Sequence, residues 1–216
     1  MGDDKKIVNS ARISYNGESK GDEADKKLLF YLYKNLHMSP FEMAKITMHV
    51  KMPIFVMRQF VRHRMQNLNE ISFRYTEPKD DFYIPTVWRK QAVKNKQGSE
   101  IDENWWPSFR REMPQTILDE IRSTNQDPNI QLVTIAGHEN VSEEVEKICN
   151  ELYKVYESMV NSGVAREMAR MILPVNLYTE IYTTFDLRNL LHFISLRSDP
   201  HAQLEIREYS KAFEKI

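Results

Sequence analysis

The segment spanning residues 45–52 alternates strictly between apolar and polar side chains. Successive side chains of a β-strand point to opposite faces, so this period of two predicts a strand with one face in the core and the other in water. Residues 175–185 show an approximate period of two and predict a second strand. Together with the helical patterns around them, these strands indicate an α+β fold in which helices flank an antiparallel sheet.

Helical spacing of apolar residues predicts most of the remaining regular structure. Pro53 stands at the first position of a short helix, Gly163 is a typical C-cap, and Asp186 is expected to cap the helix that follows it. The expected helices lie at about residues 22–36, 53–61, 113–121, 145–163, 164–173 and 187–197, with a last one from residue 199.

The length and composition of the chain limit the kinds of protein that it can be. Its 216 residues predict a single domain, 1–216, with a variable insertion at about residues 88–140. A net charge of −1 argues against a general nucleic-acid-binding protein. No apolar run of about 18 residues and no signal peptide occur, so no membrane partner is expected. The single cysteine, Cys149, excludes an internal disulfide and indicates a reducing, cytoplasmic location, and no residues show metal-ligand spacing.

Four arginines lie within residues 58–74, and no acidic residue lies between positions 53 and 69 to offset them. On a helix, Arg58 and Arg62 would be repelling i, i+4 neighbours, so these side chains need anions from elsewhere. Arg62 and Arg64 would point about 200° apart on the same helix. That geometry predicts contacts to separate ligands or across a subunit interface.

Two other interpretations of these polar residues stay open. A nucleic-acid-binding module would use Arg58, Arg62, Arg64 and Arg74 as a phosphate-binding stripe. A solvated basic face fits less well, because the same predicted helix is rich in apolar side chains. Residues 39–42 have the spacing of a capping box with a proline at the first helical position, and such a helix start can receive a phosphate.

The order Arg62-His63-Arg64, seven residues and then Ser72 resembles the signature motif of flavin-dependent thymidylate synthases. Residues 163–174 and 186–197 resemble two further blocks of that family. The resemblance extends from about residue 37 to residue 206, and residues 88–140 contribute nothing to it. A flavoprotein with different redox chemistry on the same fold is a further alternative.

The resemblance implies FAD as the cofactor and dUMP as the substrate. The residues that it implies for the cofactor are His37, Ser39, Arg62, His63, Arg64, Glu70, Asp186, Arg188 and His192. Those that it implies for the nucleotide are Gln59, Arg62, Glu70, Ser72, Arg74, Arg170 and Arg197. Asp186 departs from the asparagine that many members have at its position.

The resemblance also implies reductive methylation of dUMP to dTMP, with 5,10-methylenetetrahydrofolate as carbon donor and NADPH as reductant. Arg197 and Ser72 are the catalytic candidates: Arg197 would stabilise negative charge on the pyrimidine, and Ser72 would hold the substrate. Cys149 lies within a regular amphipathic pattern, which makes it a poor nucleophile. The family resemblance finally implies a homotetramer whose active sites are shared between subunits.

Overall fold

The central sheet contains three antiparallel strands in the order β1-β7-β2. β1 (Lys45–Pro53) pairs along its whole length with one edge of β7 (Tyr178–Asp186), and β2 (Gln66–Glu70) pairs with the other edge. The computed structural model describes residues 3–112 and 132–216. The chain divides into two compact units, residues 1–78 with 178–216 and residues 79–177, and the sheet belongs to the first.

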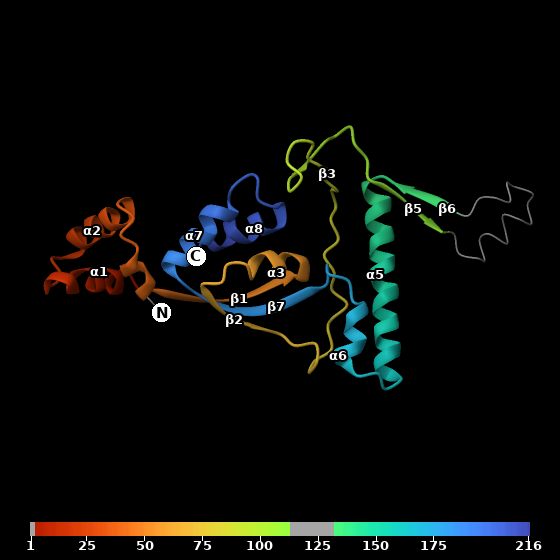
Figure 1. Cartoon of the computed structure of the whole chain (residues 1–216), viewed down its shortest axis with the longest axis horizontal. Helices are drawn as coiled ribbons and strands as arrows, with labels where there is room; N and C mark the ends of the chain where they lie inside the picture. Colours follow the sequence, from red (N-terminus) through yellow and green to blue (C-terminus); the bar gives the residue numbers. More distant parts are fainter. Residues whose placement is uncertain (1–2, 113–131) are drawn as a thin grey trace, which may run out of the picture. The chain divides into compact units, whose positions relative to one another are not determined.

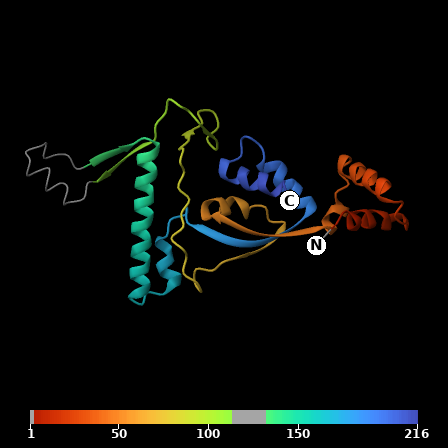
Figure 2. The same cartoon turned by 180° about the vertical axis from the view of Figure 1, so that it is seen from behind.

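One face of the sheet carries the core of the first unit. Figures 1 and 2 show α3 (Ile54–Phe60), α7 (Leu187–Arg197) and α8 (Leu204–Phe213) on the same side of the sheet. Buried side chains alternate along β1 as the sequence predicts, and the other face remains polar, with His49 stacked on Tyr182 at 4.6 Å. The predicted α+β class with an antiparallel sheet is confirmed. The core cluster consists of Met48, Val50, Met52, Val56, Met57, Phe60, Ile181, Phe185, Leu190, Phe193, Ile206 and Phe213.

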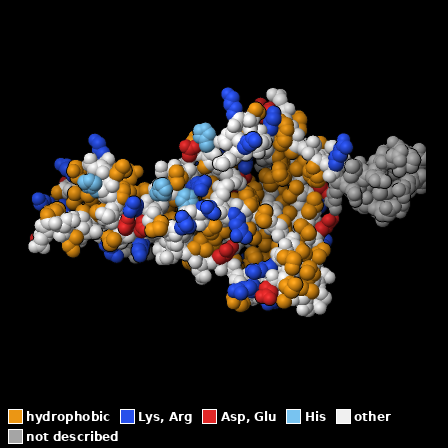
Figure 3. Space-filling model, viewed as in Figure 1, with side chains coloured by type: hydrophobic (Ala, Val, Ile, Leu, Met, Phe, Trp, Pro, Cys, Tyr) orange, Lys and Arg blue, Asp and Glu red, His pale blue; other side chains and the backbone are white. Residues whose placement is uncertain are grey.

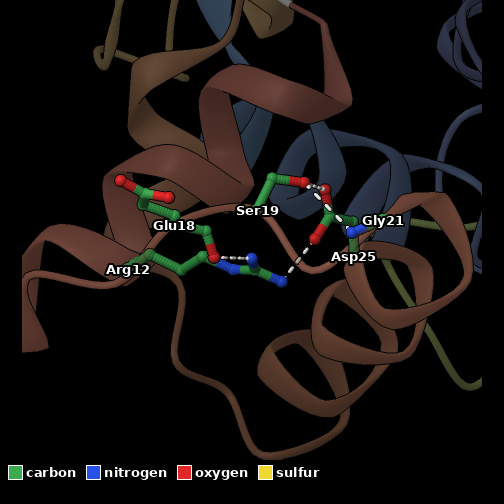
Figure 4. Close-up of polar contacts among 5 residues, drawn as sticks. All are labelled: Arg12, Glu18, Ser19, Gly21 and Asp25. Atoms are coloured by element: carbon green, nitrogen blue, oxygen red, sulfur yellow. Dashed lines mark hydrogen bonds and ion pairs between the residues drawn. The ribbon is translucent and has the colours of Figure 1, made fainter.

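A buried ion pair joins the first two helices, α1 (Asp4–Arg12) and α2 (Asp22–Lys34), which the 3-10 turn η1 (Ile13–Tyr15) separates. Arg12 is 2% exposed, and its guanidinium contacts the Asp25 carboxylate and the carbonyl oxygen of Glu18 (Figure 4). Ser19 Oγ donates to the other Asp25 oxygen at 2.8 Å. Because these bonds pair the buried guanidinium with a carboxylate and a carbonyl oxygen, they hold the connecting loop against both helices.

The second unit is built around the long helix α5 (His138–Asn161), which is followed by a left-handed Gly163 with φ of 91°, as predicted. The expected helix at 164–173 is divided into α6 (Arg166–Ala169) and the 3-10 turn η3 (Arg170–Ile172). Asn176 Nδ2 donates to Tyr83 O at 3.0 Å and to the buried Cys149 Sγ at 3.3 Å. The short strands of this unit are β3 (Lys90–Gln91), β4 (Ser99–Glu100), β5 (Ser108–Glu112) and β6 (Leu132–Ala136).

Several local expectations were wrong. Residues 39–43 form a 3-10 turn, η2 (Ser39–Met43), whose N-cap is Met38 with no side-chain capping bond, so the expected capping box does not form. The last helix begins at Leu204 rather than near residue 199. Arg62 and Arg64 lie in a turn between α3 and β2, so they do not share a helix and their opposed helical directions do not arise. The expected helix at 113–121 lies outside the described residues. Among the described helices, none is both long and apolar enough to cross a membrane.

Candidate functional site

Two adjoining pockets of the first unit run along α7. One, of about 620 Å³, lies between α7 and the turn that follows α3, and the other, of about 670 Å³, lies between α7 and the end of α2. Met65, Asn189 and His192 line both, so we treat the two as one groove, called the α7 groove below. Its other lining residues are Arg62, His63, Arg64, Phe185, Leu196 and Arg197 on one side and Tyr33, Lys34, Leu36, Met38, Arg188 and Leu191 on the other.

The α7 groove is strongly cationic. Five arginine or lysine side chains line it, and its lining within the described part of the chain includes no Asp or Glu. Lys, Arg and His side chains gather around α7 in the space-filling view (Figure 3). Volumes of this size hold cofactor-sized molecules, and Arg forks bind phosphate oxygens two at a time. The groove therefore fits a large ligand that carries phosphate groups and also offers apolar surface.

Residues distant in the sequence meet where His63 contacts Arg197. Arg197 Nε donates to His63 Nε2 at 2.9 Å, and the His63 ring lies edge-on to the buried Phe193 ring, with centroids 4.8 Å apart. Burial first, and then the nearby charges of Arg197 and His192, lower the pKa of His63 to about 4. His63 is therefore neutral near pH 7, and its Nε2 is an acceptor. Burial also lowers the pKa of Arg197, which starts high enough for the guanidinium to stay charged.

The position of α7 is fixed at its first turn. Asp186 caps the helix as predicted, accepting from Asn189 N at 2.9 Å with one carboxylate oxygen and from Asn189 Nδ2 at 2.7 Å with the other. His192, further along the same helix, lines the groove. Arg188 contacts the Glu42 carboxylate, and both side chains are partly exposed. An exposed pair of this kind contributes little, so Arg188 can exchange Glu42 for a phosphate.

Five of the nine expected cofactor residues line the groove, and Glu70 and Asp186 are among those that do not. Arg62, His63, Arg64, Arg188 and His192 line it. His37 and Ser39 do not, but they flank Met38, which does. His37 follows Leu36, a lining residue with a positive φ of 57° that closes the end of α2. The other nine lining residues were not expected from the sequence, because the family resemblance assigns none of them a role: Tyr33, Lys34, Leu36, Met38, Met65, Phe185, Asn189, Leu191 and Leu196.

Only some of the expected nucleotide residues line the α7 groove. Arg62 and Arg197 line the α7 groove, whereas the others do not. Glu70, at the end of β2, accepts from the buried Thr179 at 2.7 Å, and the side chain of Gln59 donates to Gln203. Ser72 Oγ accepts from Arg74 N at 3.4 Å, and the Arg74 guanidinium lies 5.1 Å from the centre of the Tyr75 ring. Arg170 is exposed at the start of η3 in the second unit.

Comparison with known proteins identifies the family. The profile of the family described as thymidylate synthase complementing protein matches residues 1–216. The flavin-dependent thymidylate synthase of Thermus thermophilus is 43% identical over 219 residues, covering 100% of this chain and 68% of that protein. The enzyme of the same name from Thermosipho africanus is 42% identical over 211 residues, covering 97% of this chain and 79% of that protein.

A solved structure supports the same assignment. The UMP/dUMP methylase PolB from Streptomyces cacaoi, bound with 5-Br dUMP, has a TM-score of 0.74 and 28% identity, covering 98% of this chain and 84% of that one. The similarity extends over the fold and not only over the arginine motif, which confirms the resemblance drawn from the sequence. The chain therefore belongs to the flavin-dependent thymidylate synthase family.

Proposed function

We propose that this protein converts dUMP to dTMP by reductive methylation, with FAD bound in the α7 groove. The carbon donor is 5,10-methylenetetrahydrofolate and the reductant is NADPH. The observation that carries the proposal is the groove itself, with five cationic side chains and no carboxylate among its described lining residues, on a chain of this family. When bound, the flavin supplies the hydride.

The lining residues have distinct parts in binding the cofactor. Arg62, Arg64, Lys34 and Arg188 carry the charge that the two phosphates of a dinucleotide require. Met65, Leu191 and Leu196 provide apolar surface for rings, and Asn189 and His192 provide hydrogen-bonding groups between them. This mixture of apolar walls and a few polar groups is typical of cofactor sites.

Arg197 is the proposed electrostatic catalyst. Its Nε is occupied by His63, so only its two Nη groups are available for a substrate. A fixed, partly buried cation stabilises the negative charge that develops on a pyrimidine ring when a nucleophile adds to it. The only thiol of the chain, Cys149, is 3% exposed within α5 and bonded to Asn176, which supports a reaction without a cysteine nucleophile.

We also propose that the enzyme is a homotetramer with shared active sites. Gln59, Glu70, Ser72 and Arg74 lie outside the groove that contains Arg197, which supports a site completed by residues of another chain. The opposed helical directions expected of Arg62 and Arg64 no longer support a shared site, because both residues lie in a turn.

The test begins with the purified protein, FAD, dUMP, methylenetetrahydrofolate and NADPH. We expect a retained flavin spectrum and formation of dTMP, and about 10²–10³-fold slower turnover for Arg197→Ala with FAD still bound. Bound flavin without dTMP would assign the protein to different redox chemistry. A colourless protein that binds nucleic acid in a salt-dependent way would instead favour the phosphate-stripe interpretation.

A further inference from the structure

The turn that carries Arg62-His63-Arg64 is held by the side chain of one of the seven residues between that triplet and Ser72. Gln66, the first residue of β2, donates from Nε2 to the carbonyl oxygens of His63 at 2.8 Å and Phe60 at 3.2 Å. Thr183 of β7 donates from Oγ1 to Gln66 Oε1 at 2.6 Å. Thr183 is 1% exposed, so water does not compete for this bond.

The chemistry of the groups fixes which atom donates and which accepts in each of these bonds. A backbone carbonyl oxygen only accepts, so the two hydrogens of the Gln66 amide point to Phe60 and His63. The amide oxygen must then face Thr183, whose hydroxyl acts as the donor. Every polar atom of the Gln66 side chain has a partner, and the alternative amide orientation would set acceptors against each other.

The contacts continue into the candidate site, where His63 accepts at its carbonyl oxygen from Gln66 and at Nε2 from Arg197. The His63 main chain is fixed by Gln66, and its ring is held against Phe193 at a centroid distance of 4.8 Å. Nε of Arg197 can only donate, so His63 Nε2 accepts from it and the ring proton is carried on Nδ1. His63 therefore decides how the guanidinium of Arg197 is turned within the groove.

We infer that Gln66 and Thr183 are positioning residues of this site, which orient Arg197 through His63. The inference rests on the proposed function for its kinetic consequence, but the hydrogen-bond chain can be tested without turnover. A misplacement of about 1 Å in a catalytic group can cost roughly 10²-fold in rate. Loss of these hydrogen bonds should thus lower kcat while the FAD content stays at the parent level.

The sharpest variants act on the buried hydroxyl. Thr183→Val removes the donor and keeps the shape, and Thr183→Ser keeps the donor. Thr184→Val is the matched control, because Thr184 is the next residue of β7, and its hydroxyl pairs with Thr47 at 2.8 Å on the opposite face of the sheet. We expect kcat to fall about 10–100-fold for Thr183→Val and to stay within about threefold of the parent for the other two.

A second variant tests whether the two side chains act through one hydrogen-bonded path. It also keeps the inference testable if Thr183→Val does not fold. Gln66→Met removes the amide at a half-buried position and should lower kcat by a similar factor. Because both residues act through one path, the double variant should be no slower than either single one, whereas independent effects would multiply. A multiplied loss in the double variant would contradict a single path.

Titration of the His63 imidazole provides a readout that does not depend on activity. In protein with 13C-labelled histidine, the His63 signal, assigned by its loss in His63→Gln, should titrate near pH 4 in the parent. Burial is the main cause of that low pKa, so loss of the bonds that hold the ring in place should raise the pKa in Thr183→Val and Gln66→Met. Parent protein that makes no dTMP would overturn the proposed function and leave this readout intact. An active parent with unchanged kcat and unchanged His63 titration in both variants would overturn the inference.

Discussion

The contact between His63 and Arg197 joins two side chains that the sequence assigned to different ligands. His63 was expected at the cofactor and Arg197 at the nucleotide. In the structure, Arg197 Nε lies 2.9 Å from His63 Nε2. Since His63 is neutral, it can accept from Arg197 without opposing the charge that Arg197 brings to the site. An arginine held in this way loses little conformational freedom on binding, which favours a fixed catalytic geometry.

His63 should make the folded protein less stable in mild acid. Its pKa of about 4 in the folded chain is below the ordinary value of 6.5, so between these pH values the unfolded chain holds a proton that the folded chain lacks. The His63 contribution to the free energy of unfolding should be most favourable above pH 6.5 and fall as the pH drops towards 4. Urea unfolding of the parent and of His63→Gln across this window measures it. The variant should lose less stability, and equal losses would assign the effect to other groups.

At the level of helices, the first turn of α7 depends on Asp186. Both of its carboxylate oxygens are bonded to Asn189, and the helix they start carries Arg188, His192 and Arg197. An N-cap satisfies backbone N–H groups that have no partner within the helix, so it fixes where the helix begins. The same carboxylate was expected at the cofactor, and a local bond now accounts for each of its oxygens.

Replacement of Asp186 can separate a capping role from a cofactor contact. Asp186→Ala should lower the free energy of unfolding by about 1 kcal/mol, and Asp186→Asn should restore most of it, because asparagine caps equally well. Thermal unfolding and FAD titration of both variants are the measurements. If Asp186 is only a cap, Asp186→Asn binds FAD like the parent. A loss of FAD affinity of about tenfold or more in that variant would reveal a direct contact with the cofactor.

Breaking the buried ion pair between α1 and α2 should destabilise the protein far more than removing an exposed charge nearby. Asp25→Ala leaves Arg12, which is 2% exposed, without its carboxylate and should cost about 3–5 kcal/mol. Asp22→Ala is the control, because Asp22 lies in the same first turn of α2 and is exposed. That change should cost less than about 1 kcal/mol. Similar denaturation midpoints for the two variants would show that the buried pair is replaced by solvation of Arg12.

At the scale of the whole molecule, four predicted nucleotide residues of the first unit do not line the α7 groove, whereas Arg62 and Arg197 do: Gln59, Glu70, Ser72 and Arg74. Ser72 follows β2, whereas Arg197 lies at the end of α7 and lines the groove. A strand advances about 3.3 Å per residue, so β2 leads the chain well away from the turn at its start. Shared sites in an oligomer bring such residues together without any change in the fold of one chain.

Mixing two variants of lowered activity tests this arrangement. Arg197→Ala and Ser72→Ala protein, each made separately and then unfolded and refolded together, should regain dTMP formation if one site takes these residues from different chains. Refolding each variant alone provides the control. Light scattering of the FAD-bound parent should give about four times the chain mass of 25.7 kDa. No recovered activity in mixed oligomers would place both residues of a site in the same chain.

Much of the fold and part of the site could be predicted from local patterns. Strand β1 shows in its alternation, and α7 in the cap at Asp186, because side-chain direction and capping depend on neighbours within a few positions. The Arg62-His63-Arg64 motif was sufficient to suggest the family for the same reason: its chemistry lies in one short stretch.

The features that local patterns did not predict are strand β2 and the contacts between distant residues, and both depend on long-range pairing. Residues 66–70 have no alternation, since most of their side chains are exposed, so pairing with β7 alone makes them a strand. Gln66 and Thr183 are 117 positions apart, and His63 and Arg197 are 134 positions apart. Local sequence thus determined the elements, the caps and the charge of the motif. Long-range packing determined which groups meet, because contacts between distant segments depend on strand register and helix docking and leave no periodic trace in either segment.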